Sequence, residues 1–248
     1  MSVENIYIFQ KGFNYSQDGP GNRLVYHLSG CNLFCPWCSN PEGMDRNKST
    51  TALTVDEIVK EALSCRMMFI DGGGVTLTGG EVTCQKNAVI TLLKSLKSNG
   101  INTCIETNAS IAGCDDIINE VDYMIADYKS PDGDILKKYT GADIDVIKHN
   151  LLLRAKTGKP LLVRVPLIGF FNTGEENALL FGDFFEKLRT ESNNDNLFFE
   201  ILTYHEYGKE KYTKLGKAYT VSDGFVTESQ VKALLQELKK RNLKVINT

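Results

Sequence analysis

Three cysteines stand close together early in the chain, and their side chains are the first candidates for chemistry. Cys31, Cys35 and Cys38 have the spacing C-x3-C-x2-C. Thiolates that converge from one short loop indicate a metal or cluster site. Three ligands are one fewer than a closed structural zinc site or a fully ligated cubane cluster requires. The spacing therefore predicts a [4Fe–4S] cluster with one open iron, and an open iron favours catalysis.

A zinc knuckle is the main alternative for this loop. Such a site needs a fourth ligand close by, and His27 is the local candidate. Unrelated, unligated thiols are the other alternative.

Composition limits the class of protein. The chain has 248 residues, and 42% hydrophobic with 24% charged residues is ordinary for a globular protein. A net charge of −3 argues against a nucleic-acid partner. No apolar run reaches the ~18 residues of a membrane span, and Met1–Asn5 do not look like a signal peptide. Seven cysteines, an odd number, indicate reduced thiols, so we expect a cytoplasmic enzyme with no membrane partner.

Apolar runs alternate with helical patterns along the chain. We expect strands at 24–28, 75–78, 101–106, 121–126, 160–166 and 197–202, and helices at 54–68, 81–99, 115–120, 132–138, 143–156, 174–190 and 227–241. Residues 1–23 are expected to form turns, 39–53 and 206–226 irregular polar connections, and 244–246 a short strand. The alternation predicts an α/β fold with a parallel sheet. No repeat or linker divides residues 1–248, so one domain is expected.

Polar residues follow five of the expected strands. They are Gly79-Gly80-Glu81, Glu106-Thr107-Asn108, Asp127 with Lys129, Arg164, and Tyr204-His205. Ligands of parallel α/β sheets bind at the carboxyl ends of the strands, here called the mouth. Six strand–helix units are too few for an eight-stranded barrel. The sequence therefore predicts an open, partial (β/α)6 TIM-type barrel with the cysteine loop over its mouth.

These motifs together resemble a known family. Gly30-Cys31-x3-Cys35-x-Trp37-Cys38, followed by Gly79-Gly80-Glu81, resembles the cluster and SAM-amino-group motifs of radical S-adenosylmethionine (SAM) enzymes. Further segments resemble the branch that activates glycyl-radical enzymes, of the pyruvate formate-lyase activating type. These segments are Asp18-Gly-Pro-Gly-Asn-Arg23, Asp127-Tyr-Lys129, Arg164-Val-Pro-Leu-Ile-Gly169, and Tyr204-His205 with Lys211-Tyr-x2-Leu-Gly.

The resemblance implies roles for individual residues. Cys31, Cys35 and Cys38 would bind the cluster, and SAM would chelate the open iron. Gly79, Gly80 and Glu81 would accept from the SAM ammonium, and Lys129, Arg164 and His205 would contact the rest of SAM. Glu106, Thr107, Asn108 and Asp127 would supply oxygens to SAM or to a monovalent cation, and an Asp127–Lys129 salt bridge is the alternative for Asp127. Asp18 and Arg23 would frame the mouth, with Asp18 on the target peptide or simply stabilising a turn.

The implied activity is the reductive cleavage of SAM to a 5′-deoxyadenosyl radical, which then generates a glycyl radical on a partner enzyme. A flavodoxin or ferredoxin would donate the electron, because only one cluster is expected, and the protein would be a monomer in an anaerobic cytoplasm. One alternative is a radical SAM enzyme acting on a small molecule or peptide, similar to 7-carboxy-7-deazaguanine synthase. The other is a non-catalytic metal-binding module.

Overall fold

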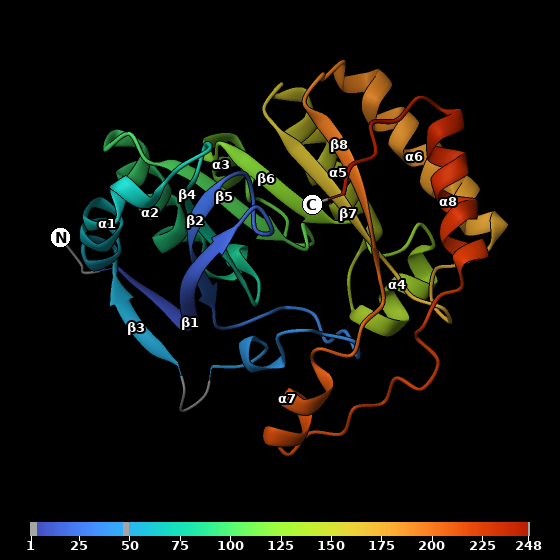
Figure 1. Cartoon of the computed structure of the whole chain (residues 1–248), viewed down its shortest axis with the longest axis horizontal. Helices are drawn as coiled ribbons and strands as arrows, with labels where there is room; N and C mark the ends of the chain where they lie inside the picture. The colour runs from blue at the N-terminus through green and yellow to red at the C-terminus, as the bar shows by residue number, and fades with distance from the viewer. Residues whose placement is uncertain (1–3, 47–49, 248) are drawn as a thin grey trace. The chain divides into compact units, whose positions relative to one another are not determined.

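A computed structural model describes residues 4–46 and 50–247 (Figure 1). Two short segments lie outside the described residues. They are residues 1–3, where no signal peptide was expected, and residues 47–49 of the predicted polar connection. The chain divides into two compact units. The first comprises Met1–Asn32, Asn40–Thr107 and Gly113–Ile125, and the second comprises Leu33–Ser39, Asn108–Ala112 and Ala126–Thr248. The predicted α/β class is confirmed, with a mostly parallel sheet that does not close among the described residues.

The strands of the first unit combine a parallel core with an antiparallel extension. They are β1 (Asn5–Tyr15), β2 (Asn22–Leu28), β3 (Thr51–Thr54), β4 (Gly74–Gly79) and β5 (Asn102–Thr107). Strands β2, β4 and β5 run parallel, with Arg23 opposite Gly74 and Gly74 opposite Asn102. Strand β1 pairs antiparallel with both β2 and β3. The carboxyl ends of β2, β4 and β5 therefore meet at one edge.

The prediction of turns through residues 1–23 is wrong for β1. Only Ile6 and Ile8 of this strand are buried, and its second half is mostly exposed and polar. That half lacks the clear apolar alternation by which a strand is recognised in a sequence. It is held instead by the ladder from Gln10 to Tyr15 against β2. Strand β3 was missed for the same reason, because none of its four residues is buried.

The helices of the first unit are α1 (Val55–Ser64), α2 (Lys86–Ser98) and α3 (Asp115–Glu120), with short 3-10 turns at Pro41–Gly43, Arg66–Met68 and Val82–Gln85. A capping box begins α1: Thr54 accepts from the Glu57 backbone N–H, and Glu57 accepts from that of Thr54. Helix α1 ends at Ser64 rather than Met68, because Arg66–Met68 tighten into a 3-10 turn. Helix α2 buries Val89, Leu92, Leu93 and Leu96 in the unit's core.

The second unit contains the end of β6 (Tyr123–Asp127), then α4 (Gly133–Thr140), α5 (Ile144–Lys156), β7 (Leu161–Leu167), α6 (Glu175–Ser192), β8 (Leu197–Thr203), α7 (Lys209–Lys214) and α8 (Glu228–Lys240). Strands β7 and β8 are parallel over seven residue pairs. Helix α7 was not predicted, and the expected final strand is a single bridge from Val245 to Phe199. An aromatic core of Tyr128, Phe181, Phe185 and Phe199 packs α6 onto this sheet.

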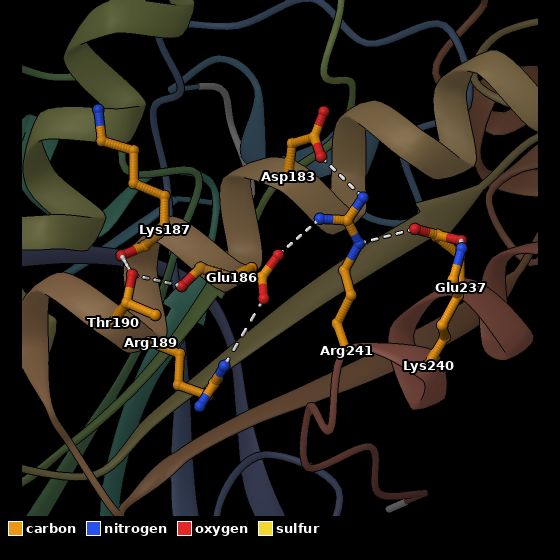
Figure 2. A network of polar contacts seen from close by, with 8 residues as sticks. All are labelled: Asp183, Glu186, Lys187, Arg189, Thr190, Glu237, Lys240 and Arg241. Atoms are coloured by element: carbon orange, nitrogen blue, oxygen red, sulfur yellow. Dashed lines mark hydrogen bonds and ion pairs between the residues drawn. The ribbon is translucent and has the colours of Figure 1, made fainter.

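Arg241, just after α8, fastens α8 to α6. Its guanidinium lies between three carboxylates, at 2.7 Å from Asp183, 2.8 Å from Glu186 and 2.7 Å from Glu237 (Figure 2). The Arg241 side chain also crosses Gly182, where an added Cβ would meet its Nε at 2.5 Å. These carboxylates raise the pKa of Arg241 above its usual value, led by the hydrogen bond with Glu237. The two helices are therefore joined by polar as well as apolar contacts, and they lie side by side in Figure 1.

Replacing Arg241 with alanine is expected to destabilise the protein by about 1–2 kcal/mol, because several charge-assisted hydrogen bonds are lost at a partly buried position. Lys240→Ala is the matched control, since Lys240 is exposed and its nearest carboxylate lies 4.0 Å away. Urea unfolding followed by circular dichroism measures both variants. Equal stability of the two variants would contradict this role for Arg241.

No helix among residues 4–46 and 50–247 is long and apolar enough to cross a membrane.

Candidate functional site

In the first unit, the Gly79-Gly80-Glu81 segment packs directly against the segment that leads into the cysteine loop. The Gly80 N–H donates to the Leu28 carbonyl at 2.7 Å, and the Glu81 N–H donates to the Gly30 carbonyl at 2.8 Å. A Cβ on Gly80 would meet the Gly30 carbonyl oxygen at 2.3 Å, so only glycine permits this approach. The segment before Cys31 is thus fixed on the glycine motif.

The backbone around Cys31 is held from its other side by the 3-10 turn at Pro41–Gly43. The Gly30 N–H donates to the Gly43 carbonyl at 2.8 Å, and the Cys31 N–H donates to the Met44 carbonyl at 3.0 Å. Gly30 has a φ of 103°, which favours glycine. The start of the cysteine loop is therefore positioned by backbone hydrogen bonds.

Glu81 is fully buried, and its carboxylate joins the ends of two strands. Its Oε1 accepts from the Thr83 N–H at 2.9 Å, from the Thr83 hydroxyl at 2.6 Å and from the Thr107 hydroxyl at 2.6 Å. Glu81 Oε1 thus links the residues that follow β4 to the end of β5. Contact between Glu81 and the SAM ammonium remains a prediction.

Glu106 and Thr107 end β5 beside this motif. The Thr78 hydroxyl donates to Glu106 Oε2 at 2.6 Å, so Glu106 faces β4 at the carboxyl end of the sheet. Asn108 belongs to the second unit, where its side-chain oxygen accepts from the Ser110 N–H at 2.9 Å and hydroxyl at 2.7 Å. The structure therefore brings Glu81, Glu106 and Thr107 together in one unit.

Asp18 and Arg23 do not frame the mouth as expected. Arg23 is fully buried at the amino end of β2, where it donates to the Thr76 hydroxyl at 2.6 Å and the Val75 carbonyl at 2.9 Å. The Asp18 carbonyl accepts from the same Thr76 hydroxyl at 2.7 Å, and its carboxylate accepts from Asn14. This loop covers the amino-terminal half of β4, because Arg23 must satisfy its donors there. The contact of Asp18 with a target peptide stays a prediction.

In the second unit, Cys35 and Cys38 occupy one tight turn. The Cys38 N–H donates to the Cys35 carbonyl at 3.2 Å, and the Phe34 N–H donates to the Thr140 carbonyl at 3.2 Å. Trp37, between the two cysteines, is largely buried and packs its ring 4.4 Å from that of Phe171. The aromatic residue of the motif therefore anchors the turn.

Residues 206–219, here called the strap, hold this turn from another side. Tyr212 donates its hydroxyl to the Cys35 carbonyl at 3.1 Å, and Lys211 donates its ammonium to the Ser39 carbonyl at 3.0 Å. A Cβ on Gly208 would meet the Cys38 carbonyl oxygen at 2.1 Å. The sequence showed Lys211 and Tyr212 only as part of a family signature and gave them no role. Their role is to clamp the carbonyls of the cysteine turn.

Lys129 and Asp127 form the ion pair that the sequence offered as one of two possibilities. Burial alone would lower the pKa of Lys129, but Asp127 and the thiols of Cys35 and Cys38 raise it above its usual value. Lys129 therefore stays protonated and places a positive charge near two of the cysteines. A neighbouring cation favours the thiolate form, which is the form that binds metal.

Arg164 and His205 complete the predicted residues of this unit. Arg164 lies opposite Glu200 across β7 and β8, and its Nε donates to Glu200 Oε2 at 2.7 Å with both residues buried. His205 stacks on Tyr207 at 4.0 Å, and burial lowers its pKa. Contacts of either residue with SAM remain predictions. The pairing of Arg164 with Glu200 depends on strand register, so the sequence did not indicate it.

Glu200→Ala is expected to destabilise the protein by about 3–5 kcal/mol, because it leaves the Arg164 guanidinium buried without its carboxylate. The double variant Arg164→Met, Glu200→Leu is expected to recover most of this loss. Urea unfolding of the metal-free protein measures both. If Glu200→Ala lowered the free energy of unfolding by less than about 1 kcal/mol, as for an exposed ion pair, the Arg164–Glu200 pair would not stabilise the fold.

The donor set fits an iron–sulfur cluster. None of the three cysteines forms a disulfide; Cys31 belongs to the first unit, while Cys35 and Cys38 share a turn in the second. Among the described residues, no three His, Cys, Asp or Glu side chains lie close enough together to hold a metal ion. Thiolates are the usual ligands of iron–sulfur clusters.

Comparison with known proteins decides the family. The model of the radical SAM superfamily matches residues 25–182, which includes the cysteine loop, the glycine motif and strands β4 to β7. The chain belongs to the radical SAM superfamily. It is therefore a radical SAM enzyme, and the predicted partial-barrel class is that of this superfamily.

The curated relatives of the chain are enzymes of the type that the sequence resembled. Pyruvate formate-lyase-activating enzyme of Staphylococcus epidermidis is 33% identical over 219 residues, which cover 83% of this chain and 84% of that protein. The Staphylococcus aureus enzyme of the same name is 32% identical over 216 residues, with the same coverage. The predicted resemblance to pyruvate formate-lyase-activating enzymes is thus confirmed.

Solved structures support the fold alone. A domain of pyruvate-formate lyase-activating enzyme from Bacteroides vulgatus has a TM-score of 0.57 at 22% identity and covers 71% of this chain and 98% of its own. Streptococcus suis SuiB bound to its precursor peptide SuiA has a TM-score of 0.64 at 19% identity and covers 89% of this chain and 46% of its own.

Proposed function

We propose that this radical SAM enzyme generates a glycyl radical on a partner enzyme. The observation that carries the proposal is the similarity to curated activating enzymes over 83% of the chain. The family model covers residues 25–182, which include the cysteine loop and the glycine motif. The packing of Gly79–Glu81 on Gly30 agrees with a site in which SAM and the cysteine loop are adjacent.

Cys31, Cys35 and Cys38 would hold a [4Fe–4S] cluster, whose open iron would take SAM. When bound, these groups supply a one-electron cleavage of SAM that yields the 5′-deoxyadenosyl radical. The chain's own residues supply position and charge. Backbone groups of Gly79 and Gly80 would face the SAM ammonium, and Lys129, held protonated, would oppose its carboxylate.

The remaining predicted residues take supporting parts in this proposal. Arg164 and His205 would contact SAM, and Glu106, Thr107, Asn108 and Asp127 would offer oxygens to SAM or to a monovalent cation. Asp18 would touch the target peptide. The enzyme would act as a monomer and a single domain. It would work in an anaerobic cytoplasm, because oxygen destroys both the cluster and the glycyl radical.

Electron paramagnetic resonance on a candidate partner tests this proposal. The reconstituted protein, SAM and a chemical reductant are mixed with a glycyl-radical protein encoded beside it. A glycyl doublet on the partner is expected. SAM cleavage without a doublet on any such partner would favour a small-molecule or peptide substrate. No cleavage at all in a brown, cluster-loaded protein would contradict the enzymatic proposal.

A further inference from the structure

A groove of about 440 Å³ lies between α5 and α6 of the second unit. Leu152 of α5, together with Leu180 and Phe184 of α6, lines it with apolar surface, and these three residues are here called the apolar wall. Polar side chains of both helices and of the segment after β6 share the lining. Small-molecule sites are concave, mostly apolar and roughly 300–1,000 Å³ in volume. The size and the lining of this groove therefore fit a small ligand.

Tyr128 lines the groove and points away from the cysteine turn. Its ring packs against three phenylalanines of α6, and the ring of Phe184 is 4.7 Å away. Its N–H continues the strand ladder by donating to the Arg164 carbonyl at 2.8 Å, and the next residue, Lys129, lies near the thiols of the cysteine turn. Successive side chains of an extended segment point to opposite faces. The groove and the cysteine turn therefore lie on opposite faces of the sheet.

The hydroxyl of Tyr128 is a buried polar group that the fold does not satisfy. Tyr128 is fully buried, and its hydroxyl oxygen has no hydrogen-bond partner among the residues that the structure describes. Burial, and then the charge of Asp145, raises the pKa of Tyr128 above its usual value, so the hydroxyl keeps its proton. A buried donor without a partner destabilises a fold. A ligand with an acceptor at this point of the groove would remove that penalty.

Helix α5 brings charged side chains to the same groove. Asp145, Lys148 and His149 follow one another at helical spacing, so they share one face of α5. In the described part of the chain no ion pair joins Asp145 to Lys148. The Lys148 ammonium lies instead over the ring of Phe184, 5.6 Å from its centroid. An acid and a base thus stand next to the apolar wall without neutralising each other.

Helix α6 adds a second acid and a second base, of which only the base is available. Asp183 is directed at Arg241, 2.7 Å away, in the network of ion pairs between α6 and α8 (Figure 2). Lys187 forms a longer pair with Glu191, 3.7 Å away at an exposed position. Exposed ion pairs of this kind are weak. Lys187 can therefore turn to a ligand, whereas Asp183 remains with Arg241.

We propose that this groove binds a free amino acid with a large apolar side chain. The carboxylate of the ligand accepts from the Tyr128 hydroxyl and lies between Lys148 and Lys187. The ammonium of the ligand donates to Asp145, and its side chain covers the apolar wall. This arrangement gives each uncommitted charge of the groove a partner of opposite sign. It uses no residue of the mouth, so it does not depend on the proposed function.

Fluorine NMR of 4-fluoro-L-phenylalanine tests the site on the full-length, cluster-loaded protein without any enzymatic turnover. We expect saturable binding with a Kd of about 1 mM or below, displaced by L-phenylalanine. The analogues 3-phenylpropanoate, which lacks the ammonium, and 2-phenylethylamine, which lacks the carboxylate, should compete at least about tenfold less well. SAM without reductant should not displace the probe. No saturable binding, displacement by SAM, or equal competition by either analogue would overturn the proposal.

Two variants test the residues of the groove. Tyr128→Phe removes only the hydroxyl, so it should weaken binding severalfold, while the melting temperature of the unliganded protein stays the same or rises. Lys148→Gln should weaken binding severalfold as well. Lys156→Gln is its matched control, because Lys156 is exposed at the end of the same helix and does not line the groove.

The two measurements separate a binding role from a structural one. A lower melting temperature of unliganded Tyr128→Phe would mean that the hydroxyl already has a partner within the fold, and it would overturn the proposal. Equal affinities of Lys148→Gln and Lys156→Gln would do the same. L-phenylalanine should raise the melting temperature of the unmodified protein, because a ligand that binds only the folded state stabilises it.

Discussion

Cys35→Ala is expected to abolish SAM cleavage. The substitution removes one of three thiolates from a cluster that has no fourth protein ligand, so two ligands remain where three are needed. Because the Cys35 carbonyl is bonded by Tyr212 and by the Cys38 N–H, the backbone of the turn should keep its shape in the variant. The loss should therefore be one of cluster binding and not of folding.

The measurement is 5′-deoxyadenosine formed per protein after anaerobic reconstitution, together with iron content and visible absorption. Cys65→Ala is the matched control, because Cys65 lies at the end of α1 and outside the motif. Near-native cleavage is expected for Cys65→Ala and none for Cys35→Ala. Retained cleavage in Cys35→Ala would mean that the cluster is bound elsewhere.

Gly208→Ala is expected to cause the second largest loss. Gly208 has an ordinary helical conformation, with φ of −76° and ψ of −21°, so alanine brings no backbone strain. Its new Cβ, however, would lie 2.1 Å from the Cys38 carbonyl oxygen, and a backbone atom cannot move as a flexible side chain can. The strap must then separate from the cysteine turn, at a cost of about 1–3 kcal/mol.

The expected result is a severalfold loss of bound iron and of SAM cleavage, with secondary structure retained. Gly12→Ala provides the control, because a Cβ at that position in β1 meets nothing within 4 Å. Iron content and circular dichroism are measured on both proteins. Full cluster loading in Gly208→Ala would show that the strap does not position the turn.

Local signals in the sequence predicted much of this fold. The helices expected from residues 54 and 227 begin with capping boxes of Thr54 and Thr227, whose bonds span only three residues. Strands β4, β5, β7 and β8 lie close to their expected positions, since each contains β-branched or other apolar residues that are typical of strands. The cysteine spacing and the glycine motif identified the family before any geometry was known.

Contacts between distant segments could not be predicted in the same way. Tyr212 and Cys35 are 177 residues apart, and nothing in either segment alone indicates that they meet. The same holds for Glu81, whose carboxylate is held by a threonine 26 residues later. Asp18 was misplaced because a motif indicates order along the chain, whereas its position depends on how Arg23 satisfies its donors on β4.

Deuterium transfer from the target tests the central claim most directly. A candidate partner enzyme is labelled with α-deuterated glycine and mixed with the reconstituted protein, SAM and reductant, and the 5′-deoxyadenosine is analysed by mass spectrometry. We predict that the 5′-deoxyadenosine carries deuterium and that a glycyl radical appears on the partner in proportion. Unlabelled 5′-deoxyadenosine, formed at the same rate with and without that partner, would contradict the account.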